Sequence, residues 1–344
     1  MRLAKGEDRP TMRFEAIESS AGMRTIYMGG SHCYLPRLSD SHSCADRLPT
    51  PLFQPLARRL RGLFSADPGS QVRQSVLEGG PIPLYHWSGS PNLGDSIARV
   101  LVEGLSGRPT IIVGKREGPR LLACGSILGR ARRGDIIWGA GSLRPDHLPH
   151  SRRIEVRAVR GPLTRSLLRE EGIPCPEIFG DPALLLPLVM PRPPEITSRF
   201  RVGIVAHYVD KPEVRKRLGA SSADPSIVQL DIQGGLEPFL TTLWQCERIV
   251  STSLHGVIFA EAYGIPAREW RLTDEAGRDR VRGASHKFED YYLGTGRERP
   301  EPLTGEAWDE VDEAPPPRID PGLLPSFPFL RAEPDGGGGG DVIS

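Results

Sequence analysis

The sequence predicts an α/β fold with two lobes, each built around a parallel sheet. Short apolar segments of β type alternate with helical segments from residue 81 onward, a pattern typical of parallel sheets covered by helices. A proline-rich stretch at 187–194 interrupts the alternation, which then starts again. The length of 344 residues is enough for about two domains.

The first lobe is predicted over residues 81–190. Pro162 suits the first turn of a helix, and Gly172 suits the end of the same helix. The predicted strand segments are 82–87, 110–113, 135–138 and 154–159, and the predicted helical segments are 96–105, 120–128 and 162–171.

The second lobe is predicted over residues 201–300, after a proline-rich linker at 191–200. It opens with a buried strand at 201–208, and strands and helices then alternate as in the first lobe. The later strands are 226–231 and 248–251, and the helices are 213–218, 235–246 and 256–263.

The two ends of the chain lack this alternation. Residues 1–80 are rich in Ser, Arg and Pro and are expected to be variable and partly disordered. Within them, 53–64 reads as a basic amphipathic helix, which could lie on an anionic membrane or pack on the main domain; packing is favoured. The acidic, Pro- and Gly-rich residues 301–344 are expected to form a disordered tail.

Charge and cysteine content narrow the class of protein. With 44 basic and 43 acidic side chains, nothing in the net charge of +1 points to a nucleic-acid partner. The five cysteines form no C-x-x-C pair, which favours a reducing compartment and no metal site. Acidic residues stand where a signal peptide needs an apolar segment, and no apolar run is long enough for a membrane span. The cytoplasm is therefore expected, with contact to the inner face of the membrane as the alternative to packing of 53–64 on the main domain.

The turns that follow strands are the first places to look for a site, because ligands of open parallel sheets bind beyond the carboxyl ends of strands. After the first strand, Asn92, Gly94 and Asp95 open a helix, whose free N–H groups favour an anion or a polar ligand. Asn92 and Asp95 can hydrogen-bond sugar hydroxyls, and Asp95 could act as a base. The alternative is a helix cap and nothing more.

Two further strand ends carry side chains suited to an anionic ligand. Arg160 follows the strand at 154–159, where a guanidinium can clamp a carboxylate or phosphate. His207 ends the first strand of the second lobe. The alternatives are a surface arginine and a buried structural histidine. The glycine-rich 138–142 is as consistent with a simple turn as with a site.

The most informative turn is the one after the strand at 248–251. Ser251, Thr252 and Ser253 end the strand, and His255 opens a helix of small residues. A histidine at that position can donate a proton near working pH. A capping or core histidine is the alternative of equal weight.

Six segments together resemble the polysaccharide pyruvyl transferases, in the order found in that family and over roughly residues 82–300. The resemblance is greatest to the branch that adds ketals to succinoglycan-type exopolysaccharides. The segments are 92–95, 159–162 with Thr164 and Leu167, 180–184, 206–210, 251–256 and 287–292.

This resemblance implies two Rossmann-like lobes in a GT-B-like arrangement, and transfer of the enolpyruvyl group of phosphoenolpyruvate onto two sugar hydroxyls. His255 maps onto the proposed acid and Arg160 onto one of two donor-binding arginines. Relatives carry the other arginine where this chain has Ser253, so Arg144, Arg268, Arg271 or Arg282 could supply that charge. The expected site comprises catalytic His255 and Asp95, donor-binding Arg160, Ser253, Leu254 and His207, and acceptor-binding Asn92, Gly94, Lys287 and Asp290.

The expected partners are phosphoenolpyruvate, as co-substrate rather than cofactor, and a saccharide acceptor that is lipid-linked. Neither a metal nor a nucleic acid is expected. One alternative is a glycosyltransferase of the same fold that uses a nucleotide sugar, with Glu261 holding the ribose. Another is a sugar-binding protein without catalytic activity.

Overall fold

The computed structural model describes residues 79–114, 118–219, 224–305, 308, 311 and 315–331, together with the backbone of three short strands before residue 36. The predicted basic helix at 53–64 lies outside the described residues. Residues 50–330 form one unit, and residues 1–49 with 331–344 form another.

The first sheet is parallel and has the strand order β5-β4-β6-β7-β8. The first strand of this lobe, β4, therefore lies between β5 and β6. The chain moves to one side of the sheet after β4 and to the opposite side after β6. Such a divergence leaves a ligand site at the carboxyl ends of the two strands. The strands are β4 (Ile82–Tyr85), β5 (Thr110–Ile112), β6 (Leu121–Leu122), β7 (Ile136–Trp138) and β8 (Glu155–Ala158).

Helices and short 3-10 turns connect these strands. Asn92 caps the first helix with its side-chain oxygen, 3.0 Å from the amide of Gly94. The predicted helix after Pro162 forms, and Gly172 beyond it takes the left-handed conformation with φ of 72°. The elements are α3 (Leu93–Ser106), η1 (Leu128–Arg130), α4 (Pro162–Glu170), η2 (Pro182–Leu185) and α5 (Leu186–Val189).

The second sheet is also parallel and repeats the same arrangement, with the order β10-β9-β11-β12. Its connections diverge at β9 and β11, so the turns after these two strands meet at one edge. The strands are β9 (Phe200–Val205), β10 (Ile227–Leu230), β11 (Cys246–Ser251) and β12 (Ala267–Glu269), and the helices are α6 (Lys211–Leu218), α7 (Leu236–Leu243), α8 (Leu254–Ala262) and α9 (Ala284–Gly294).

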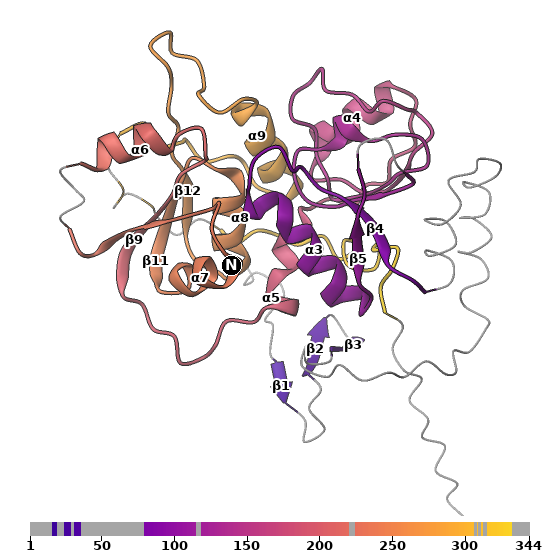
Figure 1. Ribbon diagram of the computed structural model, residues 1–344, viewed down its shortest axis with the longest axis horizontal. Coiled ribbons are helices and arrows are strands. Elements are labelled where there is room, and N and C mark those ends of the chain that lie inside the picture. The colour runs from indigo at the N-terminus through magenta and orange to yellow at the C-terminus, as the bar shows by residue number, and fades with distance from the viewer. Residues whose placement is uncertain are drawn as a thin grey trace, which may run out of the picture. The chain divides into compact units, whose positions relative to one another are not determined.

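The predicted α/β class is confirmed, because two parallel sheets carry helices between their strands (Figure 1). The helical prediction for residues 120–128 is wrong: Leu121 and Leu122 form the strand β6, which pairs with β4 and β7. The helix α9 follows the second sheet in sequence but packs on α4 of the first lobe as well as on α8. It therefore connects the two lobes.

The prediction of a disordered tail is wrong for residues 315–331. The indole N–H of Trp138 donates to the carbonyl of Leu323 at 2.9 Å, and the rings of Trp138 and Phe327 lie 4.5 Å apart. Asp320 accepts a hydrogen bond from the amide of Phe179 at 3.1 Å. Leu323 and Phe327 are buried, so this segment completes the core of the first lobe. A chain ending at Pro300 would expose that core.

Residues just after Pro300 also complete the second lobe. Trp308 is buried and packs edge-on against Trp270, with ring centroids 5.5 Å apart. Leu303 forms a bridge with the backbone of Trp270. The stretch is acidic overall, so its composition did not indicate that these apolar residues are packed on the second lobe.

In the other unit, β1 (Ala16–Glu18), β2 (Arg24–Met28) and β3 (Ser31–Leu35) form an antiparallel sheet in sequence order. No strand was predicted in these residues. None of the helices within the described ranges is both long and apolar enough to cross a membrane.

Candidate active site

The N-terminal ends of helices α3 and α8 meet, and the place where they meet is the junction of the two helices. Gly94 is the second residue of α3, and His255 is the second residue of α8. A Cβ atom on Gly94 would collide with the imidazole of His255, so only glycine allows this approach. Both helices direct the positive ends of their dipoles to this point, which favours an anionic ligand.

His255 lies in this junction with one ring nitrogen unused. Its Nε2 atom is 3.7 Å from Oδ2 of Asp181, and neither atom has a hydrogen-bond partner among the described residues. The other carboxylate oxygen of Asp181 caps η2, 3.0 Å from the amide of Ala183. Asp181 is thus fixed beside His255.

Asp181 was not among the predicted site residues, although the segment 180–184 was part of the resemblance. Gly180, with φ of 139°, places the carboxylate at the end of a segment whose Phe179 bridges to Val159 beside β8. The position at a strand end was the signal that could have identified it.

Asp95 presents a buried carboxyl group to the same junction. Burial raises its pKa to about 6, against the opposing charges of His255, His86 and Lys287. In the part of the chain that the structure describes, its carboxyl accepts no hydrogen bond. Gly125, with φ of 96°, lies so close to Asp95 that a Cβ there would be 2.8 Å from Oδ1. A carboxylate with this pKa can take up a proton near neutral pH.

His207 follows β9 and faces the site as a neutral imidazole. Its backbone amide donates to Thr252 at 2.9 Å, and its Nδ1 accepts from the amide of Val209 at 3.3 Å. Burial, with the charges of Lys287 and His255, lowers its pKa to about 3. Because Nδ1 is the acceptor, the proton is on Nε2, and the ring can donate one hydrogen bond to a ligand.

Ser253 and Leu254 form the start of α8 next to His255. Ser253 caps the helix through its backbone, and its amide donates to Ser251 Oγ at 3.0 Å. Its side chain makes no capping bond. Ser253 therefore brings a small polar group, without charge, to the predicted donor position.

Asn92 is only half-buried at the start of α3. Its Oδ1 is used as the helix cap, and its amide nitrogen makes no bond within the described ranges. That nitrogen can donate to a ligand, as the predicted acceptor role requires.

Arg160 and Asp290 form a buried ion pair rather than an open binding surface. Nη2 of Arg160 is 2.9 Å from Oδ2 of Asp290, and the guanidinium also donates to Ser126 Oγ and to the carbonyl of Ser142, each at 2.8 Å. Thr164 donates to both carboxylate oxygens of Asp290, through its amide at 2.9 Å and its hydroxyl at 2.6 Å. The exposed fractions of the two side chains are 1% and 0%.

This placement corrects the predicted role of Asp290. Both of its oxygens are occupied by protein donors and neither reaches solvent, so they cannot bind an acceptor sugar. The charge of Arg160 is balanced by Asp290 in the same way. Its role in binding the donor stays a prediction.

Lys287 lies on the same helix as Asp290 but has no such partner. It is buried, with 7% of its surface exposed. Within the described ranges, its ammonium group makes neither a hydrogen bond nor an ion pair. Burial and the charge of Arg160 lower its pKa to about 8, against the opposing charge of Asp95.

Two of the arginines proposed to replace the charge at position 253 are paired elsewhere. Arg144 contacts Asp146 at 2.8 Å, and Arg271 contacts Asp279 at 2.6 Å. Arg268 donates to the carbonyl of Glu301, and Arg282 is exposed.

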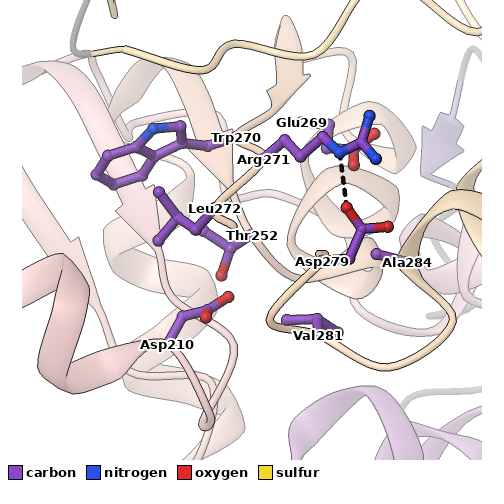
Figure 2. Close-up of a pocket in the computed structure, with 9 residues that line it drawn as sticks. All are labelled: Asp210, Thr252, Glu269, Trp270, Arg271, Leu272, Asp279, Val281 and Ala284. Carbon is purple, nitrogen blue, oxygen red and sulfur yellow. Dashed lines mark hydrogen bonds and ion pairs between the residues drawn. The ribbon is translucent and has the colours of Figure 1, made fainter. Parts of the chain in front are cut away.

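A small cavity of about 10 Å³ lies beside the turn that holds His207 (Figure 2). A space of this size admits about one water molecule, so it cannot hold a substrate. Its lining residues are Asp210, Thr252, Glu269, Trp270, Arg271, Leu272, Asp279, Val281 and Ala284.

We expect Asp95→Asn to raise the free energy of unfolding at pH 8. The folded-state pKa of about 6 exceeds the ordinary 3.8, so the folded protein holds this proton more tightly than the unfolded chain. Stability from this group therefore falls as pH rises from about 4 to 6, by up to about 3 kcal/mol at 1.36 kcal/mol per pKa unit. Urea unfolding at pH 8 should show this gain, and the difference should shrink at pH 4.5.

The exposed Asp146→Asn variant is the matched control, because its carboxylate is paired with Arg144 and has a lowered pKa. It should leave stability at pH 8 unchanged or slightly lower. A loss of stability in Asp95→Asn would mean that the carboxylate makes favourable contacts in the folded state.

Comparison with known proteins agrees with this geometry. The family model described as polysaccharide pyruvyl transferase matches residues 92–268. A relative, the uncharacterized protein L143 of Acanthamoeba polyphaga mimivirus, is 29% identical over 223 residues, which cover 63% of this chain and 76% of that protein. The matched region begins at Asn92 and includes Asp95, Asp181 and His255, which meet at the junction of α3 and α8. The chain belongs to the polysaccharide pyruvyl transferase family.

Proposed function

We propose that this protein transfers the pyruvyl group of phosphoenolpyruvate onto two hydroxyls of a saccharide, forming a cyclic ketal and releasing phosphate. The supporting observation is the pair of unpartnered groups at one junction: the Nε2 atom of His255 and the carboxyl of Asp95. They lie where the N-terminal ends of α3 and α8 provide a positive field for a donor with two anionic groups.

In the first step, His255 donates a proton to the methylene carbon of phosphoenolpyruvate. The carbon that carries the phosphate oxygen becomes cation-like, and an acceptor hydroxyl attacks it while Asp95 takes the hydroxyl proton. The carboxylate of Asp181, 3.7 Å from Nε2, lies beside the ring of His255.

In the second step, the other hydroxyl attacks the same carbon and the bond to the phosphate oxygen breaks. Two carbon–oxygen bonds form and one breaks. One of the two hydroxyl protons replaces the proton given to the methylene, and the other leaves with phosphate. The scheme requires no oxidant, reductant or metal.

The acceptor is proposed to be a sugar of a succinoglycan-type exopolysaccharide or its lipid-linked precursor. Asn92 offers its free amide N–H groups to a sugar hydroxyl at the start of α3, and the Nε2–H of His207 offers another donor. We place the reaction in the cytoplasm, at the membrane face where lipid-linked saccharides are available.

The alternative of a nucleotide-sugar transferase depended on Glu261, and the structure gives this residue another role. Both carboxylate oxygens accept from Arg297, at 2.9 and 2.7 Å, and the hydroxyl of Tyr291 donates to one of them at 2.5 Å. Glu261 is buried, and its carboxylate is already bound to these two partners.

The proposal is tested by incubating the purified chain with phosphoenolpyruvate and a lipid-linked oligosaccharide from an exopolysaccharide-producing cell. We expect phosphate release that requires both substrates, with a mass increase of the acceptor equal to one ketal-linked pyruvate. Phosphoenolpyruvate should also raise the melting temperature of the protein, because a ligand that binds only the folded state stabilises it. A rise with UDP or GDP and none with phosphoenolpyruvate would refute the proposal.

A further inference from the structure

Lys287 of helix α9 is a buried cation near the junction of α3 and α8. Its ammonium group has no ion-pair or hydrogen-bond partner among the described residues. Lys287 is 7% exposed, and its charge lowers the pKa of Asp95 in α3 and the pKa of His207 after β9. These groups belong to both lobes, so the ammonium is near enough to both lobes for its charge to act on them. Figure 1 shows α9 next to α8, and the two helices are in contact.

The acidic groups of the second lobe that face Lys287 are already paired with arginines. Asp210 contacts Arg280 at 3.1 Å, and Glu269 holds Arg299 through both of its oxygens at 2.7 and 2.8 Å. Asp95 remains as an uncompensated acid, but it makes no ion pair with Lys287 in the part of the chain described.

The other nearby cations are neutralised by acids of their own. Asp290 balances Arg160, and Asp279 balances Arg271, a pair drawn in Figure 2. Ser253 adds no charge beside His255. Among the buried lysines and arginines of the described ranges that lie near the junction, Lys287 is thus the one whose charge is still available to a donor with a phosphate and a carboxylate.

Burying an ammonium group without a partner is costly, and proteins ordinarily pair such groups or neutralise them. The cost is recovered when an anion binds to the group. The N-terminal ends of α3 and α8 add a field of the same sign at this point.

We propose that Lys287 is the residue that binds an anionic group of phosphoenolpyruvate, in addition to the helix ends, and that it does so as a point charge rather than through a guanidinium fork. The inference rests on the proposed function for the identity of the donor. It assigns Lys287 to donor binding instead of the predicted acceptor binding.

The test compares Lys287→Met with Lys216→Met, an identical change at an exposed position of α6. Calorimetry with phosphoenolpyruvate and with inorganic phosphate measures the affinity of each variant. We expect Lys287→Met to bind phosphoenolpyruvate 10- to 100-fold more weakly, the effect of losing one charged hydrogen bond. Its melting temperature should equal or exceed that of the wild type, because an unpaired buried charge is removed. Lys216→Met should match the wild type in both measurements.

Two results overturn the inference. One is affinity of Lys287→Met within twofold of the wild type. The other is weaker binding accompanied by a fall in melting temperature, which would mean that Lys287 supports the fold. If wild-type protein binds inorganic phosphate but not phosphoenolpyruvate, the proposed function fails, and loss of phosphate binding in Lys287→Met would still establish an anion site.

A second measurement uses the wild type and does not depend on the folding of a methionine variant. Between pH 8 and 10, Lys287, with its pKa of about 8, loses its proton. Of the groups that face it, Asp95, with a pKa of about 6, stays ionised over this range, and His207, with a pKa of about 3, stays neutral. Asp210, Glu269 and Arg160 are each held in an ion pair with another residue. Phosphate affinity should fall about tenfold per pH unit, the slope for loss of one proton. Lys287→Arg should flatten this fall, and an equal fall in that variant would overturn the inference.

Discussion

His255→Gln is expected to lower the rate of pyruvyl transfer by about 10²–10⁴-fold, the usual loss when a general acid is removed. The side chain of Gln can occupy a similar volume and hydrogen-bond a ligand, but it cannot donate a proton to carbon. Within the described ranges the Nε2 atom of His255 makes no hydrogen bond, and its 3.7 Å approach to Asp181 is an ion pair only when the ring is protonated. We therefore expect the melting temperature to stay close to that of the wild type.

The measurement is phosphate release under saturating donor and acceptor, together with calorimetry for donor affinity. A catalytic role predicts a large fall in kcat with donor affinity changed far less. His150→Gln, the same change at an exposed position, is the matched control and should be fully active. Near wild-type turnover by a folded His255→Gln would remove His255 from the mechanism.

Features that depend on local patterns were predictable from the sequence. The alternation of apolar and amphipathic segments gave the two parallel sheets, because burial on both faces imposes that pattern on each strand. The connections that follow β4 and β11 were also predictable as sites, because parallel strands bring such turns to one edge of their sheet. Asp95 and His255 belong to different sheets, however, so their meeting at the junction of α3 and α8 depends on how the two lobes pack.

Features that depend on distant partners were not predictable. Asp290 is 130 positions from Arg160, and nothing near either residue in sequence reveals that their charges cancel. The unpaired state of Lys287 is likewise a property of the packed structure, since the arginines that occupy Asp210 and Glu269 come from 30 to 70 positions away. The tail was misjudged for the same reason, because composition does not show that Leu323 fits against Trp138.

Arg160→Met is expected to destabilise the fold by about 3–5 kcal/mol, the usual cost of removing one partner from a buried ion pair. The carboxylate of Asp290 would stay buried with only Thr164 as a partner. Asp290→Leu should cost a similar amount, because it leaves the guanidinium unpaired. The double variant Arg160→Met/Asp290→Leu should recover part of the loss, since no uncompensated charge remains.

Urea unfolding of the three variants measures these free energies, with Arg152→Met as the control because its pair with Glu171 is largely exposed. The same set separates a role in the fold from the predicted role in donor binding. If Arg160 supports the site by fixing α9 against α4, the double variant regains stability and, at low temperature, binds phosphoenolpyruvate within a few-fold of the wild type. If Arg160 contacts the donor, the double variant regains stability but not affinity, because the guanidinium is absent whatever occupies position 290. Only the second outcome would return Arg160 to the donor site, and Lys287 would then share the donor's charge with it.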